Sequence, residues 1–138
     1  MAIRLGTEED VSSVCALEAL AFPDPWSETD VAAHRKEAHL CFLVFEEEGE
    51  VRGYLLGSCI PPEGEIFRVA SHPSFRRRGI AEALCTEFFS LCEITLLEVR
   101  RSNLAARALY EKLGFSLVGE RRSYYKDPTE DACLYRRE

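Results

Sequence analysis

The sequence predicts a mixed α/β fold (α+β mixed), with a central mixed sheet of about six or seven strands and about four helices. Two observations lead to this prediction. Apolar runs typical of strands alternate along the chain with segments whose apolar residues recur at helical spacing. In addition, a strand at residues 66–70 is followed by a helix and then by a strand at 94–100, and such a unit is expected to be parallel and right-handed.

The first elements are a short strand at residues 3–5 and a helix for which Thr7 is a good N-cap. The apolar residues of this helix recur at helical spacing as far as Ala21. Prolines at positions 23 and 25 then force a loop, and Ser27 caps a second, short helix.

A continuous apolar run at residues 40–45 is expected to be a strand with both faces covered. A glutamate-rich turn at 46–50, expected to be a solvated tip, joins it to a return strand at 51–60. Two prolines and a glycine at 61–64 then turn the chain into the strand at 66–70.

The second half of the chain starts with a helix expected at about residues 80–91, and a buried strand follows at 94–100. Ser102 and Asn103 then cap a helix that runs to Leu113, with Gly114 as a natural helix-ending residue. The last elements are expected to be two short strands, at residues 115–118 and 132–135. A long polar segment at 121–131 is expected to join them.

Composition narrows the classes of function. The chain has 138 residues, 46% hydrophobic and 30% charged, and we expect a single domain spanning 1–138. A net charge of −7 argues against a nucleic-acid partner. No apolar run approaches the roughly 20 residues of a membrane span, and the N-terminus has no signal-peptide core. We therefore expect no membrane partner and a cytoplasmic location.

Cysteine usage gives no indication of a metal site. Six cysteines are present, but none forms a C-x-x-C pair and no histidine lies at metal-ligand spacing from them. Most lie in apolar runs, where a cysteine behaves as a small buried hydrophobic side chain. A catalytic cysteine would need a neighbouring base, which the sequence does not show.

Three consecutive arginines stand where a helix is predicted to begin: Arg76, Arg77 and Arg78. The first turn of a helix carries partial positive charge, so cations are unfavourable there unless an anion binds between them. Exposed backbone N–H groups and the arginines would then converge on one phosphate group. Because Gly79 and Ala81 are small, the phosphate could approach the backbone closely. The alternative is a solvated basic helix start that binds nothing.

Two polar residues lie in apolar elements of the second half. Glu98 interrupts the strand at 94–100 and shares a face with Leu96. Partly apolar surroundings raise the pKa of a carboxyl group, which suits a general base near neutral pH. The alternative is a strand-end charge paired with Arg100 or another cation. Tyr110 lies on the inner face of the next helix, where the alternative is a core aromatic residue.

Two stretches resemble the GNAT family of acetyl-CoA-dependent N-acetyltransferases. The pattern R-x-x-G-x-A at 76–81, directly after a strand, is similar to the pyrophosphate loop of this family. The run L-E-V-R-x-S-N-x-A-A-x-x-L-Y-E-x-L-G-F at 97–115 closely resembles the signature of ribosomal-protein-alanine N-acetyltransferases, the RimI type. The resemblance covers nearly the whole chain and implies the GNAT acyl-CoA N-acyltransferase fold.

This resemblance implies roles for individual residues, with acetyl-CoA as the cosubstrate and no metal. Glu98 would be the general base and Tyr110 the general acid. Asn103 would hold the pantetheine arm. Backbone groups of Val69, Ala70 and Ser71 would contact the acetyl and pantetheine groups, and Ser71 departs from the apolar residue that is frequent there. The pyrophosphate would be held by Arg76, Arg77, Arg78, Gly79, Ile80, Ala81 and Glu82.

Two further stretches resemble the acceptor side of the same enzymes. The loop around Trp26 is similar to the loop between the first two helices of RimI-type enzymes, which borders the acceptor site; the alternative is a tryptophan that plugs the edge of the core. The tail, with Tyr124 and Tyr125, is similar to the last hairpin of protein N-terminal acetyltransferases, where paired tyrosines border the acceptor peptide. The alternative for either tyrosine is an exposed loop residue.

The resulting hypothesis is an enzyme that acetylates the N-terminal α-amine of a protein, such as a ribosomal protein. A second hypothesis keeps the enzyme class but replaces the acceptor by a small-molecule amine, such as a polyamine or an amino acid. A third is a non-catalytic acetyl-CoA-binding sensor or partner subunit, against which the presence of both Glu98 and Tyr110 argues.

Overall fold

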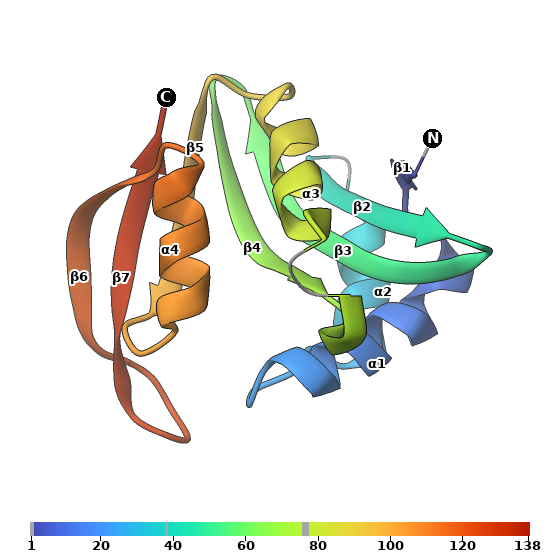
Figure 1. The fold of residues 1–138 in the computed structure, drawn as a ribbon, viewed down its shortest axis with the longest axis horizontal. Coiled ribbons are helices and arrows are strands. Elements are labelled where there is room, and N and C mark those ends of the chain that lie inside the picture. The colour runs from blue at the N-terminus through green and yellow to red at the C-terminus, as the bar shows by residue number, and fades with distance from the viewer. Residues whose placement is uncertain (1, 38, 76–77) are drawn as a thin grey trace.

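The fold is built on one mixed sheet. The computed structural model describes residues 2–37, 39–75 and 78–138. In these residues the strands are β1 (Ile3–Leu5), β2 (Leu40–Glu47), β3 (Glu50–Ile60), β4 (Glu63–Ser71), β5 (Ile94–Arg100), β6 (Ser116–Tyr125) and β7 (Glu130–Arg137). They lie in the order β1-β2-β3-β4-β5-β7-β6 (Figure 1). The predicted parallel pair is confirmed: β4 and β5 are parallel, and the other paired strands are antiparallel.

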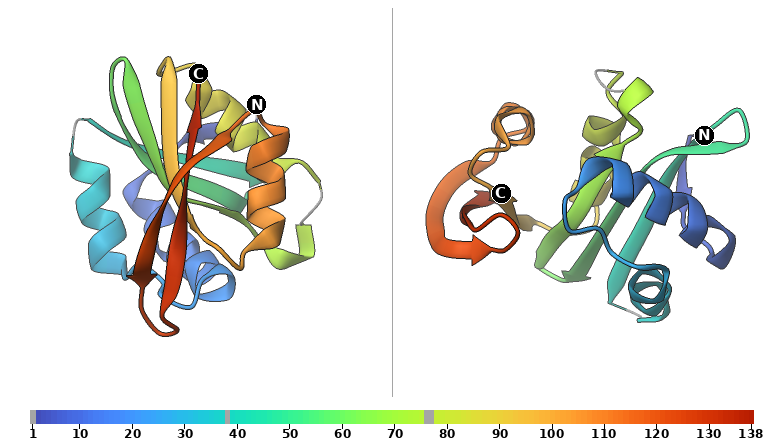
Figure 2. Two further views of the ribbon diagram at one scale, coloured as in Figure 1. Left: turned by 90° about the vertical axis from the view of Figure 1, so that its left-hand side faces the viewer. Right: turned by 90° about the horizontal axis from the view of Figure 1, so that it is seen from below.

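Helices cover both faces of this sheet. They are α1 (Val11–Ala21), α2 (Glu28–Lys36), α3 (Ile80–Phe89) and α4 (Leu104–Lys112), with short 3-10 turns at Glu8–Asp10 and Pro73–Phe75. Figure 2 shows α1 and α2 on one side of the sheet and α3 and α4 on the other. Within the described ranges, no helix combines the length and the apolar character needed to cross a bilayer.

Each face of the sheet has its own apolar core. On one face, Val14 of α1 and Val31 of α2 pack with Tyr54 and Leu56 of β3. On the other face, a larger cluster joins α3 and α4 to strands β2, β3, β4, β5 and β7, and includes Leu84, Phe88, Leu97, Tyr110 and Phe115. The apolar run at 40–45 has buried residues in both clusters, which confirms that β2 is covered on both faces.

Two of the predicted helix caps are confirmed. The Ser27 hydroxyl accepts a hydrogen bond from the N–H of Asp30, and the Asn103 side chain accepts one from the N–H of Ala106. Thr7, in contrast, caps a 3-10 turn that precedes α1, since α1 itself begins at Val11.

The most important departure from a regular sheet lies between β4 and β5. These strands pair only from Glu63↔Ile94 to Ile66↔Leu97, although β4 continues to Ser71 and β5 to Arg100. The two strands therefore separate, and a gap opens between them toward the lower edge of Figure 1. The edge of β4 that faces β5 carries backbone groups without a strand partner beyond this point. In the following text this opening is called the β4–β5 gap.

A β-bulge coincides with the start of the β4–β5 gap. Leu56 pairs with Arg68 and Gly57 pairs with Ile66, so Phe67 is the extra residue on β4. Because of this extra residue, Phe67 and Arg68 both turn toward the face of α1 and α2, where Phe67 packs on Trp26 and Arg68 meets Glu18.

The prediction for the tail was wrong in its boundaries. The segment at 121–131 is not a polar loop, because β6 extends to Tyr125 and β7 begins at Glu130. The polar side chains are exposed because β6 is the last strand of the sheet and is covered on neither face, not because the segment lacks regular structure. Local polarity therefore suggested a loop where the backbone continues its hairpin.

Candidate functional site

The turn before α3 has the geometry of an anion-binding site. Gly79 is the N-cap of α3 in a left-handed conformation, with φ of 77°, and among the residues that the structure describes a Cβ added there would meet no atom within 4 Å beyond its chain neighbours. The first N–H groups of an α-helix have no acceptor inside the helix, so those of Ile80, Ala81 and Glu82 are available to an anion at the N-terminus of α3. The side chain of Ile80 is buried in the core, so only its backbone can serve the site.

Of the three predicted arginines, the structure describes only Arg78; Arg76 and Arg77 lie outside the described residues. Arg78 forms an ion pair with Glu47 at 3.3 Å, and its guanidinium lies 5.2 Å from the ring centre of Phe75. The expectation that the glutamates of the β2–β3 turn form a solvated tip is confirmed for Glu48 and Glu50, whose side chains are 83% and 67% exposed. It is wrong for Glu47, which pairs with Arg78, and for Glu46, which binds Arg4 at 2.6 Å.

Val69, Ala70 and Ser71 form the part of β4 that borders the β4–β5 gap. Their register to β3 is regular, from Leu55↔Val69 to Gly53↔Ser71. The Val69 side chain is buried in the core below α3, so its backbone is the part that remains available at the edge. A contact through backbone groups is compatible with a serine at position 71.

Tyr110 lies in the core between α4 and the sheet. Its ring packs at 5.6 Å from Phe115 and 6.4 Å from Tyr135, measured between ring centres. Burial raises the pKa of its hydroxyl, with smaller contributions from Cys85 and Tyr125, so it is protonated at neutral pH. Tyr110 thus has the packing of a core aromatic residue and also a hydroxyl in the protonated state that a general acid requires.

Glu98 belongs to the opposite face of the sheet. Along β5, Leu97 and Val99 pack into the core with Tyr110, so the intervening Glu98 points away from it. Its carboxylate accepts a hydrogen bond from Nε of Arg121 at 3.1 Å, and its side chain is 22% exposed. The alternative of a cation partner is therefore realised, although the partner is Arg121. Glu98 and Tyr110 therefore lie on opposite faces of the sheet.

Arg100, the partner that the sequence suggested for Glu98, supports the hairpin instead. Its guanidinium donates to the carbonyl oxygens of Pro128 and Lys126, both at 2.9 Å, and pairs with Glu130 at 3.3 Å. It also lies 4.5 Å from the ring centre of Tyr125.

Tyr124 and Tyr125 approach Glu98 because β6 is irregular. The register passes from Arg121↔Ala132 directly to Tyr125↔Glu130, and the N–H of Ser123 donates to Asp131 at 2.8 Å. The two tyrosine rings meet edge to face at 5.1 Å. The charge of Glu98 raises the pKa of Tyr124, and burial, followed by Glu98, raises the pKa of Tyr125 to about 12. Both tyrosines are therefore strand residues at the site, not loop residues.

Trp26 packs against the apolar cluster on the α1 and α2 side of the sheet, which is also the face of Glu98. Its ring packs at 5.5 Å from His34 and 6.4 Å from Phe67, between ring centres. With α2 it lines a cavity of about 360 Å³. Trp26 thus both closes the edge of the core, as the alternative proposed, and contributes to a surface hollow between α2 and the start of β2.

A buried network that the sequence did not reveal holds the Trp26 loop on β4. The fully buried Glu18 of α1 accepts hydrogen bonds from the Tyr54 hydroxyl and from the N–H of Trp26. Arg68, which the bulge turns to this face, lies 3.4 Å from Glu18 and 3.3 Å from Asp24. These contacts join residues up to 50 positions apart, from Glu18 to Arg68, so no local pattern could indicate them.

The remaining predicted residues serve structural contacts at the borders of the site. Asn103 uses its side-chain oxygen to cap α4, and Glu82 lies 3.3 Å from Lys112.

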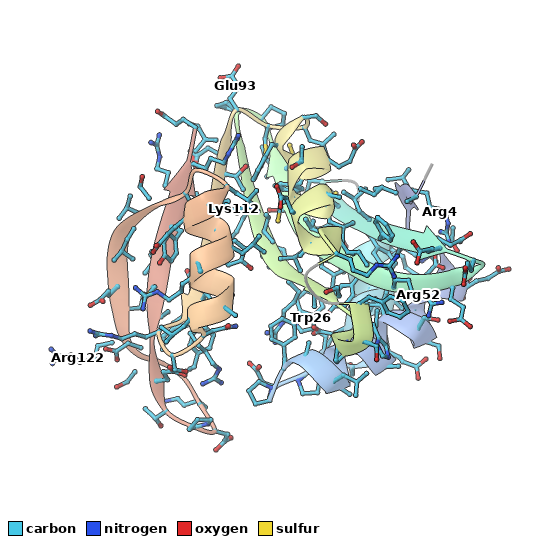
Figure 3. The ribbon with its side chains drawn as sticks, in the orientation of Figure 1. Arg4, Trp26, Arg52, Glu93, Lys112 and Arg122 are labelled. Atoms are coloured by element: carbon cyan, nitrogen blue, oxygen red, sulfur yellow. The ribbon has the colours of Figure 1, made fainter. Side chains whose placement is uncertain are left out.

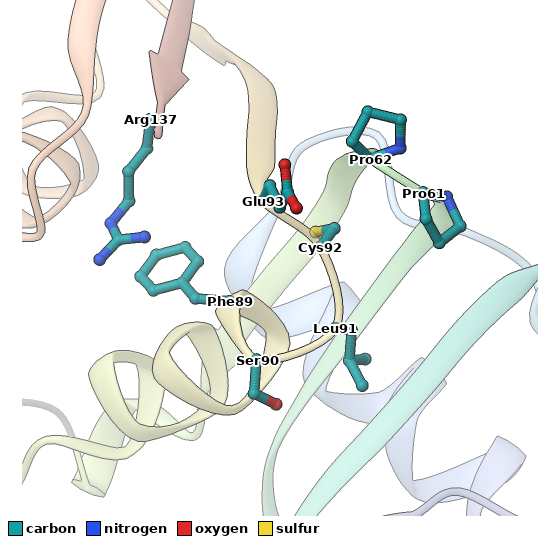
Figure 4. A pocket seen from close by; sticks show the side chains of 8 residues that line it. All are labelled: Pro61, Pro62, Phe89, Ser90, Leu91, Cys92, Glu93 and Arg137. Atoms are coloured by element: carbon teal, nitrogen blue, oxygen red, sulfur yellow. The ribbon is translucent and has the colours of Figure 1, made fainter.

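A separate hollow of about 610 Å³ lies at the opposite end of the sheet, where β4 and β5 begin (Figure 4). It is lined by residues that include Pro62, Phe89 and Arg137, and it does not adjoin the β4–β5 gap.

Comparison with known proteins is consistent with this arrangement. The family model of the acetyltransferase (GNAT) family matches residues 11–115. The [ribosomal protein bS18]-alanine N-acetyltransferase of Escherichia coli K12 is 35% identical over 132 residues, which cover 91% of this chain and 88% of that protein. The N-alpha-acetyltransferase RimI of Mycobacterium tuberculosis is 33% identical over 140 residues, which cover 96% and 89%.

The fold agrees as well. The crystal structure of the ribosomal-protein-alanine N-acetyltransferase from Escherichia coli superimposes with a TM-score of 0.89 at 30% identity, covering 98% of this chain and 91% of that chain. The predicted mixed α/β fold is thereby confirmed. The chain belongs to the GNAT family of acetyltransferases.

Proposed function

We propose that this chain is a single-domain N-acetyltransferase that transfers the acetyl group of acetyl-CoA to the N-terminal α-amine of a protein. The observation that carries the proposal is the β4–β5 gap. On one face of the sheet α3, which begins at the turn of Gly79, packs against Ile66 and Val69 of β4. On the other face lie Glu98 of β5 and, on β6, the tyrosine pair whose pKa values the charge of Glu98 raises. A molecule that passes through the β4–β5 gap would contact the α3 turn on one face and Glu98 with the tyrosines on the other.

The cofactor half fits a diphosphate. The room above Gly79 and the first-turn N–H groups of α3 would accept phosphate oxygens, with Arg78 exchanging Glu47 for the phosphate. Arg76, Arg77 and Glu82 complete the proposed contacts. Val69, Ala70 and Ser71 would bind the pantetheine and acetyl groups through the backbone, beside Asn103. Acetyl-CoA supplies an activated thioester, whose carbonyl carbon is the point of attack.

The chain's own residues then move protons. An amine attacks a thioester only as the neutral free base, and a peptide α-amine with a pKa near 8 is about one-tenth neutral at pH 7. A carboxylate such as Glu98 would accept the proton of the amine that is still protonated, directly or through water. Backbone N–H groups on the free edge of β4 near Val69 would stabilise the negative charge that develops on the carbonyl oxygen. Tyr110 would donate a proton to the departing thiolate.

An α-amine fits this machinery better than a lysine side chain does. A lysine amine with a pKa near 10.4 is only about 1 in 2,500 neutral at pH 7, so its reaction would demand a far stronger base. The relatives named above act on ribosomal protein bS18 or on N-terminal amines according to their names, which supports the same acceptor here. Trp26, Tyr124 and Tyr125 would form the walls along which the acceptor peptide lies.

The test is a thiol-release assay with acetyl-CoA and short peptides that begin with alanine or serine. We expect release of coenzyme A that requires a free N-terminus and is absent with the same peptides N-acetylated beforehand. Turnover of polyamines or free amino acids in preference to peptides would instead identify a small-molecule enzyme. Tight binding of acetyl-CoA without turnover of any amine would identify a sensor and contradict the proposal.

A further inference from the structure

Glu65 is a second carboxylate at the site, and it has no role in the proposed proton transfers. It lies on β4 opposite Leu96 of β5, one rung before the strands separate. Its neighbours Gly64 and Ile66 face α3, because a Cβ on Gly64 would touch Phe88 at 3.0 Å and Ile66 is part of the core below α3. Glu65 must therefore face the same side of the sheet as Glu98.

The two carboxylates are close enough to share one cation. Glu98 follows Leu96 by two residues, so it is the diagonal neighbour of Glu65 on the adjacent strand. With a strand spacing of ~4.8 Å and a rise of ~3.3 Å per residue, regular pairing would set the two Cα atoms about 8 Å apart. Pairing ends one residue before Glu98, and the charge of Glu98 still acts on Glu65. Glutamate side chains bridge such a separation easily when a positive group lies between them.

The structure contains such a positive group, and it comes from the exposed hairpin. Arg121 of β6 donates from Nε to Glu98 at 3.1 Å, and its charge also acts on Glu65. The Arg121 side chain is 55% exposed and lies over the ring of Tyr124, 5.6 Å from its centre. The next residue, Arg122, points away from the molecule into solvent (Figure 3).

The energetics of Glu65 favour a functional role over a structural one. Burial raises the pKa of its carboxyl group, and the charge of Glu98 raises it further, while Arg121 opposes this rise. Among the described residues its carboxylate has no hydrogen-bond or ion-pair partner within the contact distance. A half-buried carboxylate beside another carboxylate lowers the stability of the fold at neutral pH, and proteins keep such groups mainly at binding sites.

We infer that Glu65 and Glu98 together bind the α-ammonium group of the acceptor before it is deprotonated, in the position that the Arg121 guanidinium holds when no acceptor is present. This inference rests on the proposed function. It makes Glu65 an acceptor-binding residue, leaves the proton transfer to Glu98, and makes Arg121 a cation that the acceptor must displace. A cationic N-terminus is then selected over an uncharged one before the chemistry begins.

The test compares acceptor binding with turnover. Glu65→Gln is expected to raise the KM for a peptide that begins with alanine about tenfold, with kcat within about twofold of the wild type. Arg121→Gln is expected to lower the same KM, since the acceptor no longer has to displace an arginine. Matched controls are Glu63→Gln, an exposed glutamate on the same strand, and Arg122→Gln, and both should leave KM unchanged.

A second readout separates binding of the charge from a distorted strand. Calorimetry on the coenzyme A-loaded protein should show that the wild type binds the free-amine peptide more tightly than the same peptide N-acetylated. Glu65→Gln should lose most of this difference in affinity. A merely structural effect would instead lower the affinity for both peptides equally. Thermal melting should show Glu65→Gln more stable than the wild type at pH 7, because one of two like charges is gone.

The outcomes distinguish this inference from the proposed function. If the wild type acetylates no peptide, the proposed function fails, and the inference fails with it. If the wild type acetylates peptides but Glu65→Gln keeps the KM and the preference for the free amine, only the two-carboxylate site is refuted. A higher KM for Arg121→Gln would refute the displacement of Arg121 and assign it to the acceptor wall.

Discussion

The turn before α3 allows a sharp test, because the chain contains a matched control for it. Gly79 and Gly49 have the same φ of 77°, and in the described part of the chain a Cβ added at either position meets no atom within 4 Å beyond its chain neighbours. Gly79 opens α3 beside the proposed diphosphate site, whereas Gly49 forms the β2–β3 turn. Replacing each by alanine applies the same backbone perturbation at two places with different expected functions.

The stability effect should be the same for both variants. Moving a non-glycine residue into the left-handed region costs about 1–2 kcal/mol, and no collision adds to this cost at either position. For a domain of this size, a change of 1 kcal/mol lowers Tm by about 3–5 °C. We therefore expect Gly79→Ala and Gly49→Ala to melt about 3–10 °C below the wild type, still as folded proteins at 25 °C.

The effect on acetyl-CoA should differ between the two variants. At Gly79 the added methyl group would occupy the space through which a phosphate oxygen approaches the N–H groups of α3. Loss of one or two charge-assisted hydrogen bonds, at about 1.5–3 kcal/mol each, corresponds to a loss of affinity of about tenfold to ten-thousandfold. Gly49→Ala should bind acetyl-CoA like the wild type.

Isothermal titration calorimetry with acetyl-CoA measures both variants directly, and thermal melting measures the shared stability cost. Wild-type affinity in Gly79→Ala would refute the assignment of this turn to the diphosphate. Equal loss of affinity in both variants would show that the effect is one of general stability.

Three further predictions concern the reaction and the buried networks. Glu98→Gln should lower kcat about 10²–10⁴-fold, with acetyl-CoA affinity unchanged in calorimetry, and its remaining activity should rise with pH as the acceptor amine loses its proton. Tyr110→Phe keeps the ring packing, so steady-state kinetics should show kcat lower by about a hundredfold while melting changes little. Glu18→Ala leaves the Tyr54 hydroxyl, the Trp26 N–H and Arg68 without their buried acceptor. Urea unfolding should show that the free energy of unfolding falls by about 3–5 kcal/mol, and by less in Glu18→Gln.

These three predictions fail on distinct results. An unchanged kcat in Glu98→Gln or Tyr110→Phe would remove that residue from the chemistry and leave it with its observed contacts, the Arg121 ion pair or the core. A Glu18→Ala protein as stable as the wild type would show that the network does not hold the Trp26 loop on β4.

A final prediction concerns acid stability. Arg4 binds both carboxylate oxygens of Asp10, at 2.8 and 2.9 Å, and hydrogen bonds from Arg4, against the opposing effect of burial, hold the pKa of Asp10 below its usual value. A carboxyl group with a lowered pKa in the folded state stabilises the fold above its unfolded pKa of about 3.9, and this contribution is lost as pH falls through the folded value. Urea unfolding should therefore show Asp10→Asn less stable than the wild type at pH 7, with the difference shrinking below about pH 4; a constant difference would contradict this.

The sequence by itself determined the features that depend on neighbours within a few positions. Helix caps such as Ser27 with Asp30 act over three residues. Gly79 could likewise be placed at the start of a helix from its immediate neighbours. The alternation of β5 placed Glu98 and Leu97 on different faces without any knowledge of the partner strands. In the tail, the same local reasoning failed, because an uncovered strand and a loop are both polar.

Only the tertiary structure decided which charges meet. The partner of Glu98 is Arg121, 23 residues away, and its second neighbour Glu65 is 33 residues away on a strand whose register no local pattern fixes. The bulge at Phe67 turns Arg68 to Glu18, and the irregularity of β6 brings two tyrosines to the site. Strand order, register and bulges arise from the packing of the whole sheet, so side-chain contacts across strands follow from the fold and not from spacing along the chain.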